Sequence, residues 1–163
     1  MSFGHSGQRT FAVAMLMGTL CATATAQSAG EHHHGVVAPS SMKWVDVPSL
    51  PPGAKLSVLE GSMSEPVPFT ARLRLPANYR IPAHWHPGIE RVTVLSGTFY
   101  MGTGDALDAA KGVRMAAGGF AAMPAKVHHY AYTLGEPTEI QLHSTGPWGI
   151  TYLDPADDPR RKP

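Results

Sequence analysis

The fold is decided by residues 69–101, FTARLRLPANYRIPAHWHPGIERVTVLSGTFYM. Residues 69–75 alternate strictly between apolar and polar side chains, which is the pattern of a strand with one buried face. Residues 91–95 are rich in β-branched side chains, and a Ser-Gly pair then turns the chain into residues 98–101. This stretch therefore predicts consecutive short β-strands joined by tight turns.

The same pattern continues to the end of the domain. Gly and Pro separate further short runs of strand-forming residues at 120–123, 127–133, 139–144 and 150–153. Residues 105–111 are the one break, and they could form a helical turn or two. Many short strands without a long helical segment predict an all-β sandwich or barrel over residues 42–153.

Composition narrows the class of protein. The 163 residues include 13 Lys and Arg against 12 Asp and Glu, with 15% charged and 43% hydrophobic residues. This balance is typical of a globular protein and not of a disordered polyelectrolyte or a coiled coil. A near-neutral chain has no basic surface for nucleic acid, so no nucleic-acid partner is expected.

The first 26 residues have the layout of a secretory signal peptide. A short basic segment precedes the mostly apolar residues 11–20, and the small residues 21–26 end in an A-x-A pattern. The apolar run is shorter than the roughly 20 residues that span a bilayer, so no stable membrane anchor is expected after cleavage. Cleavage after Ala26 predicts a periplasmic or secreted protein. It also removes Cys21, the single cysteine, so a metal site must use nitrogen and oxygen ligands.

Both ends of the mature chain look irregular. Residues 27–41 are small and polar and predict a flexible leader. The leader contains His32–His34, which could bind divalent ions weakly or simply be solvated. Residues 154–163 hold three prolines and six charged side chains and predict a disordered tail.

The segment around His84 has the spacing of a metal site. Residues i and i+2 of an extended chain point to the same side, so His84 and His86 project their rings together. Pro87 and Gly88 allow a bend that can bring Glu90 to the same point. Two nitrogens and one carboxylate from one segment are the ligands of a facial metal site with open positions.

A second histidine group follows at residues 118–129, and the two segments together resemble the cupin superfamily. The first cupin motif is matched by His84, His86, Glu90 and Gly97, and Asn78 replaces its leading glycine. Asn tolerates the left-handed backbone conformation that glycine provides there. The second motif is matched by Gly118, Pro124 and His129, whereas Lys126 and Thr133 replace its inner glycine and its final asparagine.

The resemblance covers residues 57–153 and implies the cupin double-stranded β-helix, a jelly-roll barrel of a single domain. It implies one divalent transition metal held by His84, His86, Glu90 and His129. Sequence does not choose among Mn, Fe, Co, Ni, Cu and Zn. His128 is the rival for the fourth position, and the alternation of side chains along a strand favours His129.

Other pocket residues follow from the same alternation. If His129 points inward, Thr133 does too, and Gln141 and His143 share one face of residues 139–143. That face could line the cavity or meet solvent. Tyr100 is a further pocket candidate, with a core or rim position as its alternative.

The sequence of residues 73–102 is most similar to those of small exported cupins and of the metal-binding cupin half of some anti-sigma factors. This resemblance implies a metalloenzyme that acts on a small organic molecule, with oxygenase chemistry ahead of isomerase or lyase chemistry. The alternative is a non-catalytic metal- or ligand-binding or sensing module. Pairing of two copies through strand edges, to give a homodimer, is also consistent with the family.

Overall fold

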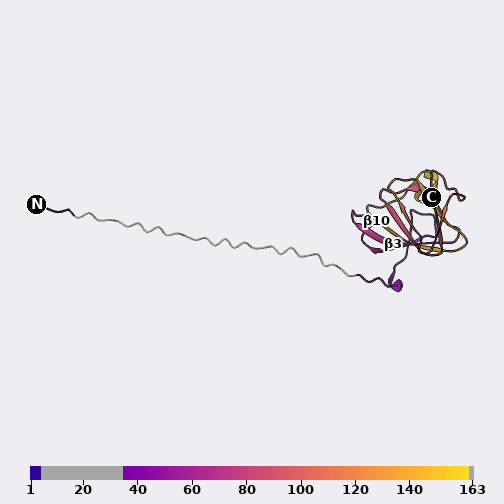
Figure 1. Ribbon diagram of the computed structural model, residues 1–163, viewed down its shortest axis with the longest axis horizontal. Coiled ribbons are helices and arrows are strands. Elements are labelled where there is room, and N and C mark those ends of the chain that lie inside the picture. Colours follow the sequence, from indigo (N-terminus) through magenta and orange to yellow (C-terminus); the bar gives the residue numbers. More distant parts are fainter. Residues whose placement is uncertain (5–34, 162–163) are drawn as a thin grey trace. The chain divides into compact units, whose positions relative to one another are not determined.

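The computed structural model describes residues 1–4 and 35–161. A compact unit begins at Val36 and contains all the strands of the described residues (Figure 1). Most of the predicted signal peptide and leader, including His32–His34, lies outside the described residues. In the described ranges no helix has the length and apolar character needed to cross a membrane.

The chain folds into two antiparallel sheets. The six-stranded sheet contains, in spatial order, β1 (Val45–Asp46), β2 (Lys55–Glu60), β3 (Pro68–Leu75), β10 (Thr138–Thr145), β5 (Glu90–Ser96) and β8 (Phe120–Met123). The five-stranded sheet contains β11 (Thr151–Tyr152), β4 (Arg80–Trp85), β9 (His129–Thr133), β6 (Thr98–Thr103) and β7 (Val113–Ala116). Three short 3-10 helices complete the described elements: η1 (Pro39–Ser41), η2 (Pro155–Asp157) and η3 (Pro159–Arg161). The predicted all-β jelly-roll fold is confirmed.

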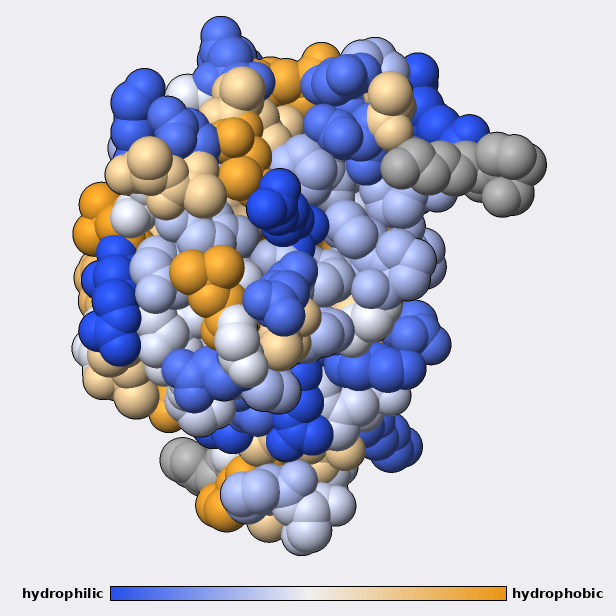
Figure 2. All heavy atoms as spheres, turned by 90° about the vertical axis from the view of Figure 1, so that its right-hand side faces the viewer, coloured by the Kyte–Doolittle hydropathy of each residue, from blue (hydrophilic) through white to orange (hydrophobic). Residues whose placement is uncertain are grey.

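Inward-facing side chains of both sheets form one hydrophobic core. On β3, Phe69, Ala71, Leu73 and Leu75 are buried whereas Arg74 between them is exposed, as strict alternation predicts. The opposing core side chains of the second sheet include Ile81, Phe99, Met101 and Ala131. Apolar groups on the face shown in Figure 2 form small separate patches among hydrophilic residues.

Residues 105–111 form a turn rather than a helix. The Asp108 carboxylate accepts a hydrogen bond from the Ala110 backbone N–H (3.0 Å), and the Asp108 carbonyl accepts one from the Lys111 N–H (3.1 Å). The hydroxyls of Tyr130 and Tyr132 donate to the Asp108 and Ala109 carbonyls, both at 2.8 Å. This turn therefore covers the outer face of β9, and all five residues of that strand are buried.

The C-terminal segment differs from the predicted disordered tail. Residues 155–161 form η2 and η3. The Asp154 side chain accepts from the Ala156 N–H (2.8 Å), which satisfies a free donor at the start of η2. Arg160 donates to Asp158 (2.7 Å) and to the Ile150 carbonyl (3.1 Å), so the segment is held against the domain. The many charged residues of this segment predict a solvated, disordered chain. The sequence does not show that some of these charges pair with one another and so order the segment.

Candidate metal centre

Three histidines meet between the two sheets. His84 lies on β4 and is paired across the ladder with His129 on β9, and His86 follows directly after β4. All three side chains are buried. One ring nitrogen from each residue lies within 4.8 Å of the other two.

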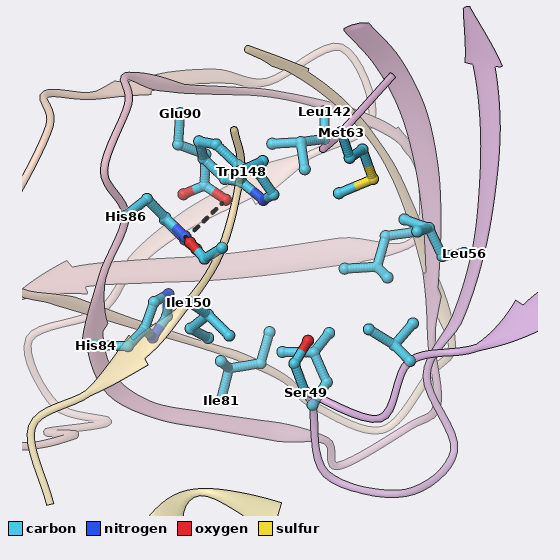
Figure 3. A pocket seen from close by; sticks show the side chains of 14 residues that line it. Ser49, Leu56, Met63, Ile81, His84, His86, Glu90, Leu142, Trp148 and Ile150 are labelled. Carbon is cyan, nitrogen blue, oxygen red and sulfur yellow. Dashed lines mark hydrogen bonds and ion pairs between the residues drawn. The ribbon is translucent and has the colours of Figure 1, made fainter. Parts of the chain in front are cut away.

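Glu90 reaches the same point from the opposite sheet. It is the first residue of β5, and its two carboxylate oxygens lie 3.6 Å from His86 Nε2 and 3.2 Å from His129 Nε2. Figure 3 shows His84, His86 and Glu90 together at one end of a cavity, with a dashed line joining His86 to Glu90. The structure therefore brings together all four residues that the sequence motifs predict as ligands.

Backbone carbonyls fix the orientation of each imidazole. His84 Nδ1 lies 2.6 Å from the Pro82 carbonyl, His86 Nδ1 2.7 Å from the Gly149 carbonyl, and His129 Nδ1 2.9 Å from the Val127 carbonyl. A carbonyl oxygen only accepts, so each Nδ1 must carry the hydrogen and donate it. In the neutral rings the lone pair is then on Nε2. Such bonds orient the histidine ligands of metal sites.

Two of the ring nitrogens that face the centre have no hydrogen-bond partner in the part of the chain that the structure describes. The buried Nε2 atoms of His86 and His129 make no hydrogen bond among the described residues. Buried polar atoms are normally satisfied, and an orphaned set points to a missing ion or water. Three imidazole lone pairs and a carboxylate suit a divalent transition metal. The residues present therefore fit such an ion.

Electrostatics keep two of the histidines neutral. Burial lowers the pKa of His84 to about 3, and repulsion from His129 and His86 acts in the same direction. Burial also lowers the pKa of His86, although the Glu90 carboxylate opposes this effect. A metal ligand must be a neutral imidazole, so these environments favour the binding form.

Glu90 and His129 influence each other. Burial raises the pKa of Glu90, but the neighbouring His86 and His129 outweigh burial and lower this pKa to about 2. Burial lowers the pKa of His129, but the Glu90 carboxylate, 3.2 Å from its Nε2, outweighs burial and the pKa is raised. Glu90 is therefore ionised, and His129 is the histidine of the centre that takes a proton most easily.

The neighbouring His128 points away from this centre. Its side chain is exposed, and its Nδ1 lies 2.6 Å from the Asp105 carboxylate. The alternation argument for His129 over His128 therefore agrees with the geometry.

Asn78 and Lys126, which stand at glycine positions of the two motifs, both have positive φ (56° and 62°). The prediction of a left-handed conformation at Asn78 is confirmed, and the Lys126 N–H donates to the His86 carbonyl (2.9 Å) and so ties the two ligand segments together.

A cavity of about 140 Å³ adjoins His84, His86 and Glu90. Apolar side chains form most of its wall: Val47, Leu50, Leu56, Met63, Leu73, Ile81, Leu142, Trp148 and Ile150. Trp148 lies flat against His86, with ring centroids 4.2 Å apart and planes inclined by 19°. Sequence patterns do not predict this wall, because its members come from strands and loops that meet only when the barrel closes.

The predicted pocket residues lie elsewhere. Gln141 and His143 contact each other (3.0 Å) on the outer face of β10, where His143 also contacts Thr70 (3.0 Å). The reason is that their neighbours Ile140 and Leu142 take the inward positions. Thr133 donates to the Pro76 carbonyl at the end of β9. Tyr100 stacks on Tyr132, with ring centroids 4.8 Å apart. None of these four residues is among those that line this cavity.

Residues 47–51, which we call the strap, border the cavity. Val47, Ser49 and Leu50 contribute to its wall, and Leu50 is buried in the core. The Tyr152 hydroxyl donates to the Ser49 carbonyl (2.8 Å), and the Tyr79 hydroxyl donates to the Pro51 carbonyl. Two tyrosines of the second sheet and its connections therefore hold the strap in place.

The fold resembles many solved structures. The polyketide cyclase RemF from Streptomyces resistomycificus is 14% identical, with 77% of this chain and 89% of that chain covered and a TM-score of 0.61. A candidate acetylacetone dioxygenase from Methylibium petroleiphilum is 24% identical, with 77% and 84% covered and a TM-score of 0.57. The anti-sigma factor ChrR, solved in complex with SigE from Rhodobacter sphaeroides, is 22% identical, with 67% and 51% covered and a TM-score of 0.49.

Sequence comparison gives the family directly. No curated protein sequence matches this chain. The model of the ChrR cupin-like domain matches residues 32–149, which include both predicted ligand segments. That match spans well over half of the 163 residues, and the jelly-roll fold agrees with it. This chain belongs to the ChrR cupin-like domain family of cupins.

Proposed function

We propose that this protein binds one divalent transition metal ion through His84, His86, Glu90 and His129, and that it is a metalloenzyme acting on a small organic molecule. The observation that carries the proposal is the convergence of three buried imidazoles on Glu90 while their Nδ1 atoms are occupied by backbone carbonyls. Each ring can then offer only Nε2 to the centre. An arrangement fixed in this way needs little reorganisation to accept an ion.

The residues of the cavity favour oxygenase chemistry over isomerase or lyase chemistry. Among the described residues that line it, the titratable side chains are His84, His86 and Glu90, all proposed ligands. Isomerases and lyases need a positioned acid or base within reach of the substrate. A bound transition metal would supply Lewis-acid character and a site for dioxygen. The apolar wall would keep water away from that site.

Metal content tests the centre. The full chain is prepared with His32→Ala, His33→Ala and His34→Ala, because these adjacent histidines would add weakly bound metal. We expect one metal ion per chain by elemental analysis, and close to none after His84→Ala with His86→Ala. His128→Ala is the matched control, since this exposed neighbour points away from the centre, and it should retain the ion. Equal metal content in the control and the double variant would refute the site.

Oxygen uptake then separates a catalyst from a binding module. Protein loaded with Fe²⁺ is mixed with small diketones, phenols and 2-oxo acids in an oxygen electrode. Uptake that depends on one class of compound and is lost in the His84→Ala and His86→Ala variant supports the oxygenase proposal. Binding of such compounds without any turnover, with Fe²⁺ or the other candidate metals, would replace it with the non-catalytic binding or sensing module.

We also propose export, on the signal-peptide pattern of residues 1–26. Mass spectrometry of the protein purified from a Gram-negative host should find an N-terminus at Gln27 in the periplasmic fraction. A cytoplasmic protein that keeps Met1 to Ala26 would contradict this proposal.

A further inference from the structure

The cavity beside the metal centre has two chemically different ends. Figure 3 shows His84, His86 and Glu90 on one side, and Leu56, Met63 and Leu142 on the opposite side of the open space. Apart from the proposed metal ligands, the polar side-chain groups in the described wall are the Ser49 hydroxyl and the Trp148 indole N–H. A ligand with hydrogen-bonding groups along its whole length would leave most of them without partners there. Burying unpaired polar groups in this way is costly.

The size of the cavity limits the ligand further. Its volume of about 140 Å³ is close to the roughly 150 Å³ of an engineered apolar protein cavity that holds one benzene molecule. Sugars and sugar acids are therefore too polar for this apolar wall. A chain or ring of about six carbon atoms matches both its volume and its wall.

The cavity offers one end at which a polar group of the ligand could bind. His84, His86 and Glu90 form the end of the cavity where a bound cation would lie. Of the described lining residues, none is a Lys or Arg that could pair with a second charge at the opposite end. The wall therefore fits a molecule with a single polar group at one end and a hydrocarbon body.

We propose that the ligand of this site is a small amphiphile, with one metal-chelating oxygen group and an apolar body of about six carbon atoms. This inference rests on the proposed function, because the chelating group needs the bound ion. It names the substrate class: short-chain diketones, 2-oxo acids with hydrocarbon tails or simple phenols, and not polyhydroxylated acids.

Alkyl hydroxamates test the proposal, since they combine one chelating group with a tail of chosen length. Their dissociation constants are measured by calorimetry on Zn²⁺-loaded full-length protein carrying the His32–His34 alanine substitutions. Affinity should increase about three- to fourfold for each added methylene group until the tail reaches about six carbons, and then fall. Replacing the terminal methyl group of a tail by a hydroxyl should weaken binding by about tenfold or more.

A cavity variant connects this series to the wall. Leu56 is half-buried at the end of the cavity away from His84 and His86, so Leu56→Ala removes three carbon atoms there. The optimum tail should lengthen by about two to three carbons, because the apolar space is larger. Met63→Ala should act in the same direction and serves if Leu56→Ala is unstable. Leu134→Ala, at an exposed residue outside the cavity wall, should leave the optimum unchanged.

The outcomes separate the two proposals. If Zn²⁺ and acetohydroxamate both fail to bind, the metal centre itself is refuted, and the ligand class falls with it. If acetohydroxamate binds but longer tails bring no gain, the metal centre stands and the proposed ligand class is overturned. An optimum that shifts equally in Leu56→Ala and Leu134→Ala would also overturn it, because the wall would then not set the length.

Discussion

Each imidazole of the candidate metal centre has two differently placed ring nitrogens. Nδ1 donates to a backbone carbonyl, at Pro82, Gly149 or Val127, and Nε2 faces the centre. Two of these carbonyls, of Pro82 and Val127, lie two residues before the histidine that they bind, and the third, of Gly149, lies far along the chain from His86. At residue scale, the chemistry of the site therefore depends on backbone positions as much as on the ligand side chains.

The pH dependence of metal binding should follow His129. Its pKa is raised by Glu90, so as the pH falls this ring is the first of the three to take a proton that competes with the metal. The pKa values of His84 (about 3) and of Glu90 (about 2) are low, so neither group adds a proton above about pH 4. Below the pKa of His129 the Zn²⁺ affinity should drop about tenfold per pH unit, and above it the affinity should be flat.

Competition with a chromogenic chelator between pH 5 and 8 measures this dependence. Glu90→Gln removes the charge that raises the pKa of His129, so the decline should begin at a lower pH, on top of a weaker overall affinity. His128→Ala should match the unmodified protein. If the logarithm of the Zn²⁺ affinity changed by two or more units per pH unit throughout this range, His84 or His86 would be taking up a proton as well. That result would contradict the lowered pKa values of these two rings.

The four residues of the candidate metal centre could be predicted from sequence, but the residues that line the cavity could not. H-x-H on an extended chain fixes the relative direction of His84 and His86 through local geometry alone. Gln141 and His143 obey the same period-2 rule, yet that rule says only that they share a face. Which face is inward depends on Ile140 and Leu142 packing against the other sheet, a contact between distant segments.

At the scale of the element, the tight turns hold the ligand strands in register. Gly97 joins β5 to β6 with φ of 73°, and a Cβ built there would lie 2.4 Å from the Pro137 carbonyl oxygen. Gly118 also has positive φ (86°), but a Cβ there would meet no atom within 4 Å. A side chain added at either position would therefore strain the backbone, but only at Gly97 would it also collide with neighbouring atoms.

Alanine at these glycines should separate the two effects. Gly118→Ala should lower the free energy of unfolding by about 1–2 kcal/mol through its left-handed backbone alone. Gly97→Ala should lower it by about 3 kcal/mol or more, because the Pro137 backbone must also move. Urea unfolding of both variants gives the comparison. Equal losses would show that the contact with Pro137 relaxes without cost.

The strap depends on tyrosine hydroxyls rather than on strand pairing. Tyr152→Phe removes the hydrogen bond to the Ser49 carbonyl and should lower the free energy of unfolding by about 1 kcal/mol. Hydrogen exchange at residues 49–54 should become faster while the rest of the domain changes little. Tyr130→Phe is the matched control, since its hydroxyl bonds Asp108 on the other side of β9. Faster exchange at 49–54 in both variants would contradict a local role for Tyr152.

At the scale of the whole molecule, the candidate metal centre takes its residues from both sheets. His84 and His129 belong to the five-stranded sheet and Glu90 to the six-stranded one, so a bound ion would link them at the core. The class of fold follows from local strand patterns, which is why all-β architecture could be predicted. The cavity and the short C-terminal helices could not, because they depend on contacts between segments far apart in sequence or on pairing of individual charges.

Metal binding should therefore raise global stability. A ligand that binds only the folded state adds about 4 kcal/mol at a free concentration one thousand times its dissociation constant. Thermal unfolding with Zn²⁺ and with a chelator measures the difference. The shift should vanish in His84→Ala with His86→Ala and persist in His128→Ala. A shift that survives in the double variant would mean that the ion stabilises the protein from another site.

The stacking of Trp148 on His86 gives the molecule an optical signal of its own. Of the three tryptophans in the chain, Trp148 is the one whose indole lies against a histidine of the centre. A paramagnetic ion such as Cu²⁺ at His86 would quench its fluorescence, whereas Zn²⁺ would leave the emission bright. Metal titrations of the unlabelled protein can thus follow occupancy of the site by tryptophan fluorescence.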